Sequence, residues 1–185
     1  MRKLSLLAHI SLDGYVSNVK GGLDWFQPGE ENLAFVCKLT ETADAAMFGR
    51  ISYQLINSFW PQAKDLPNAS PATLTYSNWY NSAQKIIVSS TLKNEEGIII
   101  SQNLGAEIKK LKASEGKDIL IFGSPSITHE LYEEQLIDDY WIFVNPIIFG
   151  DGIPLFKPSA IKTELRLVST HQFSNGELAQ HYMPS

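Results

Sequence analysis

The segment that most constrains the fold runs from Asp118 to Leu131 and reads DILIFGSPSITHEL. It begins with an apolar run typical of a strand buried on both faces, and Gly123 then allows a sharp turn where a Cβ atom would clash. Ser124 suits the N-cap of a helix and Pro125 its first position, so the free N–H groups of that helix point back toward the strand. The segment therefore predicts an α/β fold with either an anion site or an ordinary capped connection at this turn.

Strand and helix patterns alternate before this segment. Short apolar runs predict strands over residues 4–10, 43–48, 85–89 and 97–101. Amphipathic spacing predicts helices over residues 30–42, 50–56, 104–113 and 126–134. Residues 58–73, SFWPQAKDLPNASPAT, are rich in turn formers and read as a surface excursion within one domain. This alternation predicts a largely parallel sheet.

The C-terminal third has a different pattern. Three strand-like runs, DDYWIFVNPIIF, IKTELRLVSTHQF and ELAQHYM, are separated by turn signals such as GDG and SNG. Closely spaced strands of this kind are usually antiparallel. We therefore expect a single α/β domain over residues 1–185, with a mixed, mostly parallel sheet and antiparallel C-terminal strands.

Composition excludes several function classes. The net charge is −5 and no segment is strongly basic, which argues against binding nucleic acid or an anionic membrane surface. The N-terminal apolar run is too short for a signal peptide or a spanning helix, so a cytoplasmic protein is expected. Cys37 is the only cysteine and the four histidines lack ligand spacing, so we expect no metal site.

Two further motifs follow predicted strands at the places where an α/β sheet binds its ligand. In FGRISY, Gly49 ends a strand and Arg50 opens a helix, where a guanidinium either takes a phosphate by a forked contact or is a simple surface charge. In IIVSSTL, the hydroxyl residues Ser89, Ser90 and Thr91 either bind a phosphate or start a turn.

Two glycine-containing loops complete the pattern. Residues 11–22, SLDGYVSNVKGG, form a long flexible loop that can act as a lid, and its Asp13-Gly14 pair also suits a tight turn. In NPIIFGDGIPLF, Gly150 and Gly152 either let the backbone approach a ligand or form a hairpin loop.

The ordered set SLDGYVS, FGRISY, IVSSTL, DILIFGSPSITHEL and VNPIIFGDGIPLF resembles the dihydrofolate reductase superfamily. It is most similar to the branch of the reductase domain of bifunctional riboflavin biosynthesis proteins. The resemblance implies a three-layer fold with helices on both faces of the sheet, an NADPH cofactor, and hydride transfer to a small heterocyclic or ribosyl-imine substrate. It also implies a homodimer, for which the apolar positions of the C-terminal strands, including Tyr140, Trp141 and Phe143, are either the contact surface or simply core. Bifunctional members carry a zinc deaminase before the reductase, so we expect a stand-alone relative.

The resemblance also implies roles for individual residues. The cofactor-binding residues would be Gly49, Arg50, Ser52, Ser89, Ser90, Thr91, Gly123, Ser124, Pro125 and Ser126. The substrate-binding residues would be Ser11, Asp13, Trp25, Asn145, Gly150 and Gly152. The sequence departs from the family at one point, because Ser124 replaces the second residue of the usual glycine pair.

Glu30 and Asp13 are the catalytic candidates. Glu30 matches the carboxylate that dihydrofolate reductases place on the helix after the lid, although Glu30 and Glu31 are equally explained as favourable first-turn charges. Three functions stay open: a reductase resembling 5-amino-6-(5-phosphoribosylamino)uracil reductase, a true dihydrofolate reductase, and a nucleotide-binding module without catalysis.

Overall fold

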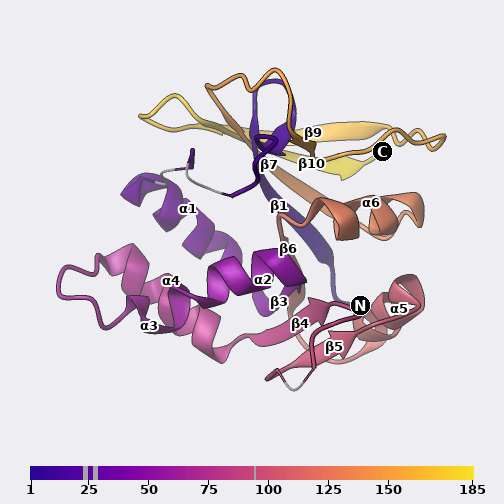
Figure 1. Cartoon of the computed structure of the whole chain (residues 1–185), viewed down its shortest axis with the longest axis horizontal. Coiled ribbons are helices and arrows are strands. Elements are labelled where there is room, and N and C mark those ends of the chain that lie inside the picture. Colours follow the sequence, from indigo (N-terminus) through magenta and orange to yellow (C-terminus); the bar gives the residue numbers. More distant parts are fainter. Residues whose placement is uncertain (23–24, 27–28, 94) are drawn as a thin grey trace.

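The computed structural model describes residues 1–22, 25–26, 29–93 and 95–185 (Figure 1). Its described residues form an eight-stranded sheet in the order β5-β4-β3-β6-β1-β7-β10-β9. These strands are β1 (Leu4–Ser11), β3 (Ala43–Gly49), β4 (Gln84–Val88), β5 (Ile98–Ile100), β6 (Asp118–Phe122), β7 (Asp139–Asn145), β9 (Leu165–Gln172) and β10 (Leu178–Pro184). A small two-stranded sheet pairs β2 (Tyr15–Ser17) with β8 (Ile153–Pro154).

The direction of β7 differs from the expectation. The strands from β5 to β7 in the sheet order run parallel, and β10 is antiparallel to both β7 and β9. The predicted antiparallel C-terminal strands are therefore confirmed for β9 and β10, whereas β7 pairs with β1 in parallel, from Ser5 opposite Asp139 to Ser11 opposite Asn145. Helix α6 makes this possible because it returns the chain to the edge where β1 begins. The carboxyl ends of β3, β6, β1 and β7 thus meet at one edge.

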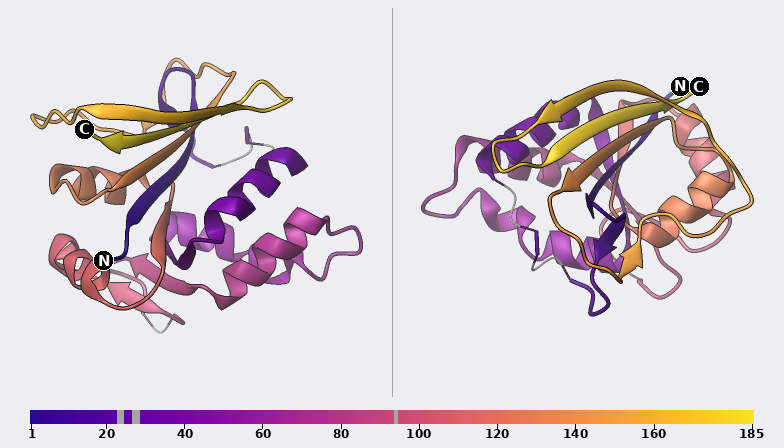
Figure 2. Two further views of the ribbon diagram at one scale, coloured as in Figure 1. Left: turned by 180° about the vertical axis from the view of Figure 1, so that it is seen from behind. Right: turned by 90° about the horizontal axis from the view of Figure 1, so that it is seen from above.

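Helices cover both faces of the sheet (Figures 1 and 2). One face carries α1 (Glu30–Thr40), α2 (Arg50–Asn57), α3 (Trp60–Ala63) and α4 (Pro71–Ser82), which pack on an aromatic core that includes Phe48, Phe122 and Phe143. The other face carries α5 (Leu104–Ala113) and α6 (Pro125–Glu133), which pack on an aliphatic core. The predicted three-layer arrangement is confirmed. Within the described ranges, no helix combines the length and apolarity that a membrane crossing needs.

Residues 58–73 are more regular than the sequence suggested. They contain α3 and the first turn of α4, where Ser70 is the N-cap and accepts the Thr73 N–H at 3.1 Å. A Ser-Pro pair is a turn signal and also a helix start, because proline suits the first helical position. The buried face of α4 includes Tyr76, Ser77 and Tyr80 rather than aliphatic residues, which hid its periodicity.

Candidate active site

The ends of β3 and β6 bring the first turns of two helices together. The backbone N–H of Gly49 donates to Ser124 Oγ at 2.8 Å, and this hydroxyl lies 2.9 Å from Ser52 Oγ. A Cβ atom at Gly49 would approach Ser124 Oγ to 3.3 Å, so a larger residue would crowd this contact. Ser124 is buried, and it joins the starts of α2 and α6 into one corner.

The turn into α6 leaves its N-terminus open. Gly123 and Ser124 both adopt left-handed backbone angles, with φ of 59° and 54°. Ser124 is the N-cap residue, as predicted, but its side chain makes no capping hydrogen bond because it is turned toward Gly49. A Cβ atom at Gly123 would meet no atom of the described residues within 4 Å, so these residues leave open space beside this turn. Free N–H groups facing open space are the chemistry of an anion site.

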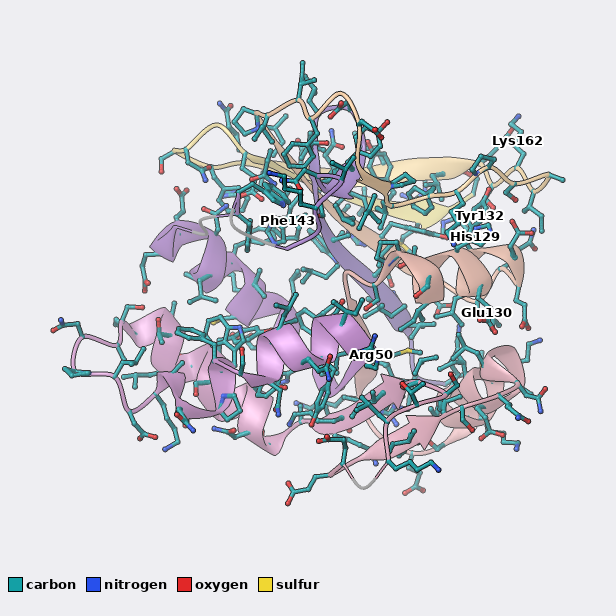
Figure 3. The ribbon with its side chains drawn as sticks, viewed as in Figure 1. Arg50, His129, Glu130, Tyr132, Phe143 and Lys162 are labelled. Carbon is teal, nitrogen blue, oxygen red and sulfur yellow. The ribbon has the colours of Figure 1, made fainter. Side chains whose placement is uncertain are left out.

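The other predicted phosphate ligands lie on neighbouring strand ends. Arg50 is exposed in the first turn of α2, where its Nη1 donates to Gln54 Oε1 at 3.2 Å (Figure 3). Ser89 Oγ accepts hydrogen bonds from the N–H groups of Thr91 and Leu92 at 3.1 and 3.0 Å. These bonds are those of a residue that starts a turn, one of the two roles considered for Ser89. Ser90 and Thr91 are exposed beside it.

Asp13 fastens the loop after β1 to the loop after β7. Its carboxylate accepts the N–H of Gly150 at 2.8 Å and that of Phe149 at 3.2 Å. The hydrogen bond with the Ser11 hydroxyl, followed by these two backbone bonds, holds the pKa of Asp13 below its ordinary value. Close backbone packing explains why position 152 is a glycine. A Cβ atom there would lie 2.2 Å from Ser17 O, where β2 pairs with β8. Contacts within the chain bring these residues together, and their role in substrate binding stays a prediction.

Glu30 has its hydrogen-bond partners outside this group. Its carboxylate accepts the Ser70 hydroxyl and the Ala72 N–H, so it holds the first turn of α4. Glu31 instead accepts the N–H and hydroxyl of Ser174, and these bonds lower the pKa of its carboxyl. Both glutamates have structural partners, and the catalytic role of Glu30 stays a prediction.

A buried polar cluster at the ends of β1 and β7 was not anticipated. Glu177 is fully buried in the hairpin between β9 and β10. Its Oε1 contacts His9 Nδ1 at 2.7 Å and Asn145 Nδ2 at 3.2 Å, and its Oε2 accepts Asn32 Nδ2. Three other segments of the chain, β1, α1 and β7, therefore converge on the Glu177 carboxylate.

Aromatic rings adjoin this cluster. The His9 ring stacks on Phe143, which Figure 3 labels, at 4.5 Å between ring centroids. The tilted Phe26 ring has its centroid 4.1 Å from that of His9. The Trp25 ring packs beside the rings of Phe26 and Phe149, with distances between ring centroids of 5.7 Å and 5.3 Å. Its indole Nε1 is buried and has no hydrogen-bond partner among the described residues. The rings of Trp25 and Phe26 thus connect the Asp13 loop with the polar cluster.

Residues 2–179 match the family model described as the RibD C-terminal domain. The chain belongs to this family. The uncharacterized protein YyaP of Bacillus subtilis (strain 168) is 29% identical over 178 residues, which cover 95% of this chain and 91% of YyaP. The predicted resemblance is confirmed.

Solved structures of related fold agree with this assignment. A candidate riboflavin biosynthesis protein from Shewanella sp. PV-4 superposes with a TM-score of 0.75 at 23% identity, covering 100% of this chain and 99% of that one. Dihydrofolate reductase from Enterococcus faecalis superposes with a TM-score of 0.66 at 15% identity, covering 99% and 96%. These likenesses establish a fold shared by RibD-type and dihydrofolate reductase structures.

In this member of the RibD C-terminal domain family, two groups of residues at one edge of the sheet make up the centre of the candidate site. The first is the corner between α2 and α6, and the second is the cluster at the ends of β1 and β7. The two groups are linked, because the Gly123 N–H donates to Leu7 O at 3.0 Å and His9 lies two residues farther along β1. No group of three or more metal-ligating side chains occurs among the described residues.

Proposed function

We propose that this family member is an NADPH-dependent reductase that transfers a hydride to a small heterocyclic or ribosyl-imine substrate. The observation that carries the proposal is the open N-terminus of α6 beside Gly123, joined by Ser124 to the helix that begins with Arg50. Family membership supports a reductase in general. The nucleotide and the substrate class are those that the family resemblance implies, and the contacts at the site support them.

The corner suits a dinucleotide phosphate. The first turn of α6 would hold the pyrophosphate, because its N–H groups and helix dipole both favour an anion. Arg50, Ser90 and Thr91 are exposed on the adjoining strand ends, where they would meet the additional phosphate of NADPH. When bound, NADPH supplies the hydride, and the protein supplies orientation.

The substrate would lie at the ends of β1 and β7. The Trp25 indole N–H has no hydrogen-bond partner among the described residues, and Asn145 belongs to the polar cluster that includes Glu177. Aromatic rings beside a few fixed polar groups are the kind of lining that binds small heterocycles. A dihydrofolate reductase would need a carboxylate from α1 at the substrate. Here the Glu30 carboxylate bonds to α4, and the residue that α1 places at the cluster is the neutral Asn32. Reduction resembling that of 5-amino-6-(5-phosphoribosylamino)uracil therefore fits this setting better than folate reduction.

Cofactor binding and turnover test the proposal together. Titration of the protein with NADPH and NADH, followed by fluorescence, should show tighter binding of NADPH. NADPH oxidation is then measured with 5-amino-6-(5-phosphoribosylamino)uracil and, separately, with dihydrofolate. Oxidation with the pyrimidine supports the proposal, and oxidation with dihydrofolate alone assigns a dihydrofolate reductase. Binding of NADPH without turnover of either compound favours a nucleotide-binding module, and absence of NADPH binding contradicts all three.

A further inference from the structure

We propose that His9 is the catalytic proton donor of this reductase and that Glu177 is the residue that positions it. The inference rests on the proposed function, since the proton accompanies hydride transfer to the substrate. Neither residue was a candidate from the sequence. The proposal comes from the contacts that the fold builds around the Glu177 carboxylate.

The first step is the burial of Glu177. Its side chain is 1% exposed, yet no lysine or arginine among the described residues forms an ion pair with it. A buried carboxylate is costly unless its oxygens are hydrogen-bonded and its charge is balanced. Two asparagine amides and the His9 ring provide the hydrogen bonds. His9 is the only one of these three partners that can carry a positive charge.

The second step is the orientation of the His9 ring. Nδ1 is held 2.7 Å from Glu177 Oε1, and Phe143 stacks on the ring. The side chain of His9 nevertheless keeps 16% of its surface exposed. Because Nδ1 faces the buried carboxylate, Nε2 is the nitrogen left for a ligand, as in other histidine–carboxylate pairs that move protons.

The third step is position. The β1 strand lies between β6, whose end forms the anion corner, and β7, whose end carries Asn145. Gly123 bonds to Leu7, and His9 lies two residues farther along, which is about 7 Å in a strand. A dinucleotide held at the corner is long enough to bring its nicotinamide to this end of β1. His9 therefore occupies the place where the hydride acceptor would be reduced.

The chemical step balances without another co-reactant. The substrate carbon would gain a C–H bond from the hydride of bound NADPH, which would be oxidised to NADP⁺. The electron pair of the substrate C=N or C=O bond moves to the heteroatom, which bonds the proton as the His9 Nε2–H bond breaks. Glu177 keeps Nδ1–H directed away from the substrate, and water returns the proton to Nε2.

The chain contains a matched control. His181 Nε2 also lies 2.7 Å from a carboxylate oxygen, that of Asp139, and the two side chains are 15% and 5% exposed. This pair differs in setting, because Asp139 is the first residue of β7 and also lies 3.2 Å from Lys3 Nζ. A purely structural histidine–carboxylate pair should behave like His181–Asp139, whereas a catalytic one should not.

Nitrogen-15 NMR of the histidine rings tests the pair without any substrate. In the folded protein we expect His9 Nδ1 to carry a proton that is held by Glu177, and Glu177→Gln should change the His9 ring signals while those of His181 stay fixed. Addition of NADPH should shift the His9 signals and leave those of His181 unmoved. An unprotonated Nδ1, or His9 signals that do not respond to bound NADPH, would overturn the inference.

Turnover provides the second measurement, with the pyrimidine or dihydrofolate as probe. His9→Asn and Glu177→Gln should each lower kcat by about 100-fold or more, the usual contribution of general acid catalysis. The double variant should be little worse than either single one, because the residues act as a unit. The Kd for NADPH should stay within about twofold of wild type, since neither residue belongs to the phosphate corner. His181→Asn should keep wild-type turnover.

The two hypotheses fail in different ways. If the wild-type protein does not bind NADPH, the proposed function fails, and the His9 assignment falls with it. If NADPH binds and His9→Asn turns over a probe as fast as wild type, the proposed function stands and His9 is excluded as the donor. If no probe is reduced, the NMR response of His9 to NADPH decides. Should Glu177→Gln fail to fold, Glu177→Asp serves instead, with a partial loss of kcat expected and an unchanged kcat contradicting the positioning role.

Discussion

At the scale of single residues, Arg50 is the side chain whose role is most directly tested. It is exposed in the first turn of α2, and its guanidinium is bound only to Gln54 among the described residues. Arg50→Ala should weaken NADPH binding by about 10- to 100-fold, because a hydrogen bond to a charged group contributes about 1.5–3 kcal/mol. NADH binding should change little. Fluorescence titration with both nucleotides measures the difference, and Lys162→Ala, which removes an exposed cation from the loop before β9 (Figure 3), serves as the control. Equal weakening of both nucleotides would contradict the role.

Glu30 carries a second prediction at this scale. Its carboxylate accepts the Ala72 N–H and the Ser70 hydroxyl at the start of α4. If this is its function, Glu30→Gln should lower the thermal midpoint by an amount equivalent to about 1 kcal/mol and leave kcat unchanged. If Glu30 is instead catalytic, kcat should fall while the Kd for NADPH is retained. Thermal unfolding and steady-state kinetics on the same variant separate these outcomes.

At the scale of elements, one hydroxyl connects α2 with α6. Ser124→Ala would leave the N–H of Gly49 without its acceptor in a buried corner, which costs about 1–3 kcal/mol. We therefore expect a lower free energy of unfolding and weaker NADPH binding together. Ser126→Ala, an exposed change in the same helical turn, should affect stability little. A Ser124→Ala protein as stable as Ser126→Ala would show that the contact contributes nothing.

The elements also show what local sequence can predict. The helix over residues 104–113 was predicted to the residue, because its aliphatic spacing and its lysine-rich last turn are local signals. By contrast, α4 was missed since its buried face includes Tyr76, Ser77 and Tyr80. The direction of β7 depends on where α6 returns the chain, which no local pattern encodes.

One part of the candidate site could be predicted from local sequence and the other could not. Gly49 and the Gly123-Ser124 turn lie at the ends of recognisable strands, so the corner was predictable. Glu177 follows Asn175 and Gly176 in a turn, where a glutamate reads as a surface charge, and its partners His9, Asn32 and Asn145 are remote in sequence. The one sign of the cluster in the sequence was Asn32, a polar residue on the buried face of α1. Recognising its partner required the fold.

At the scale of the whole molecule, the free edge of the sheet predicts self-association. All eight residues of β9 are exposed, and they include Leu165, Leu167 and Val168 at 41%, 50% and 42%. Tyr140 and Phe143 of β7 are core residues, so the exposed apolar side chains of the C-terminal strands are mainly those of β9, together with Leu178 of β10. An unpaired apolar edge strand is an aggregation hazard that proteins usually cover.

A second copy is the occupant that we propose for this edge, because two identical edge strands pair by a twofold axis and satisfy each other's backbone groups. Light scattering should give twice the 20.7 kDa mass of one chain. Leu167→Lys should shift the mass to that of the monomer, since it places a charge on the edge strand. Leu66→Lys, at a residue 47% exposed in the segment between α3 and α4, should leave the dimer intact. A wild-type mass of one chain would refute the dimer, and an unchanged dimer in Leu167→Lys would place its interface elsewhere.

Because β10 separates β9 from β7, such a dimer leaves the strand ends that carry His9 and Ser124 free, and monomeric Leu167→Lys should still bind NADPH.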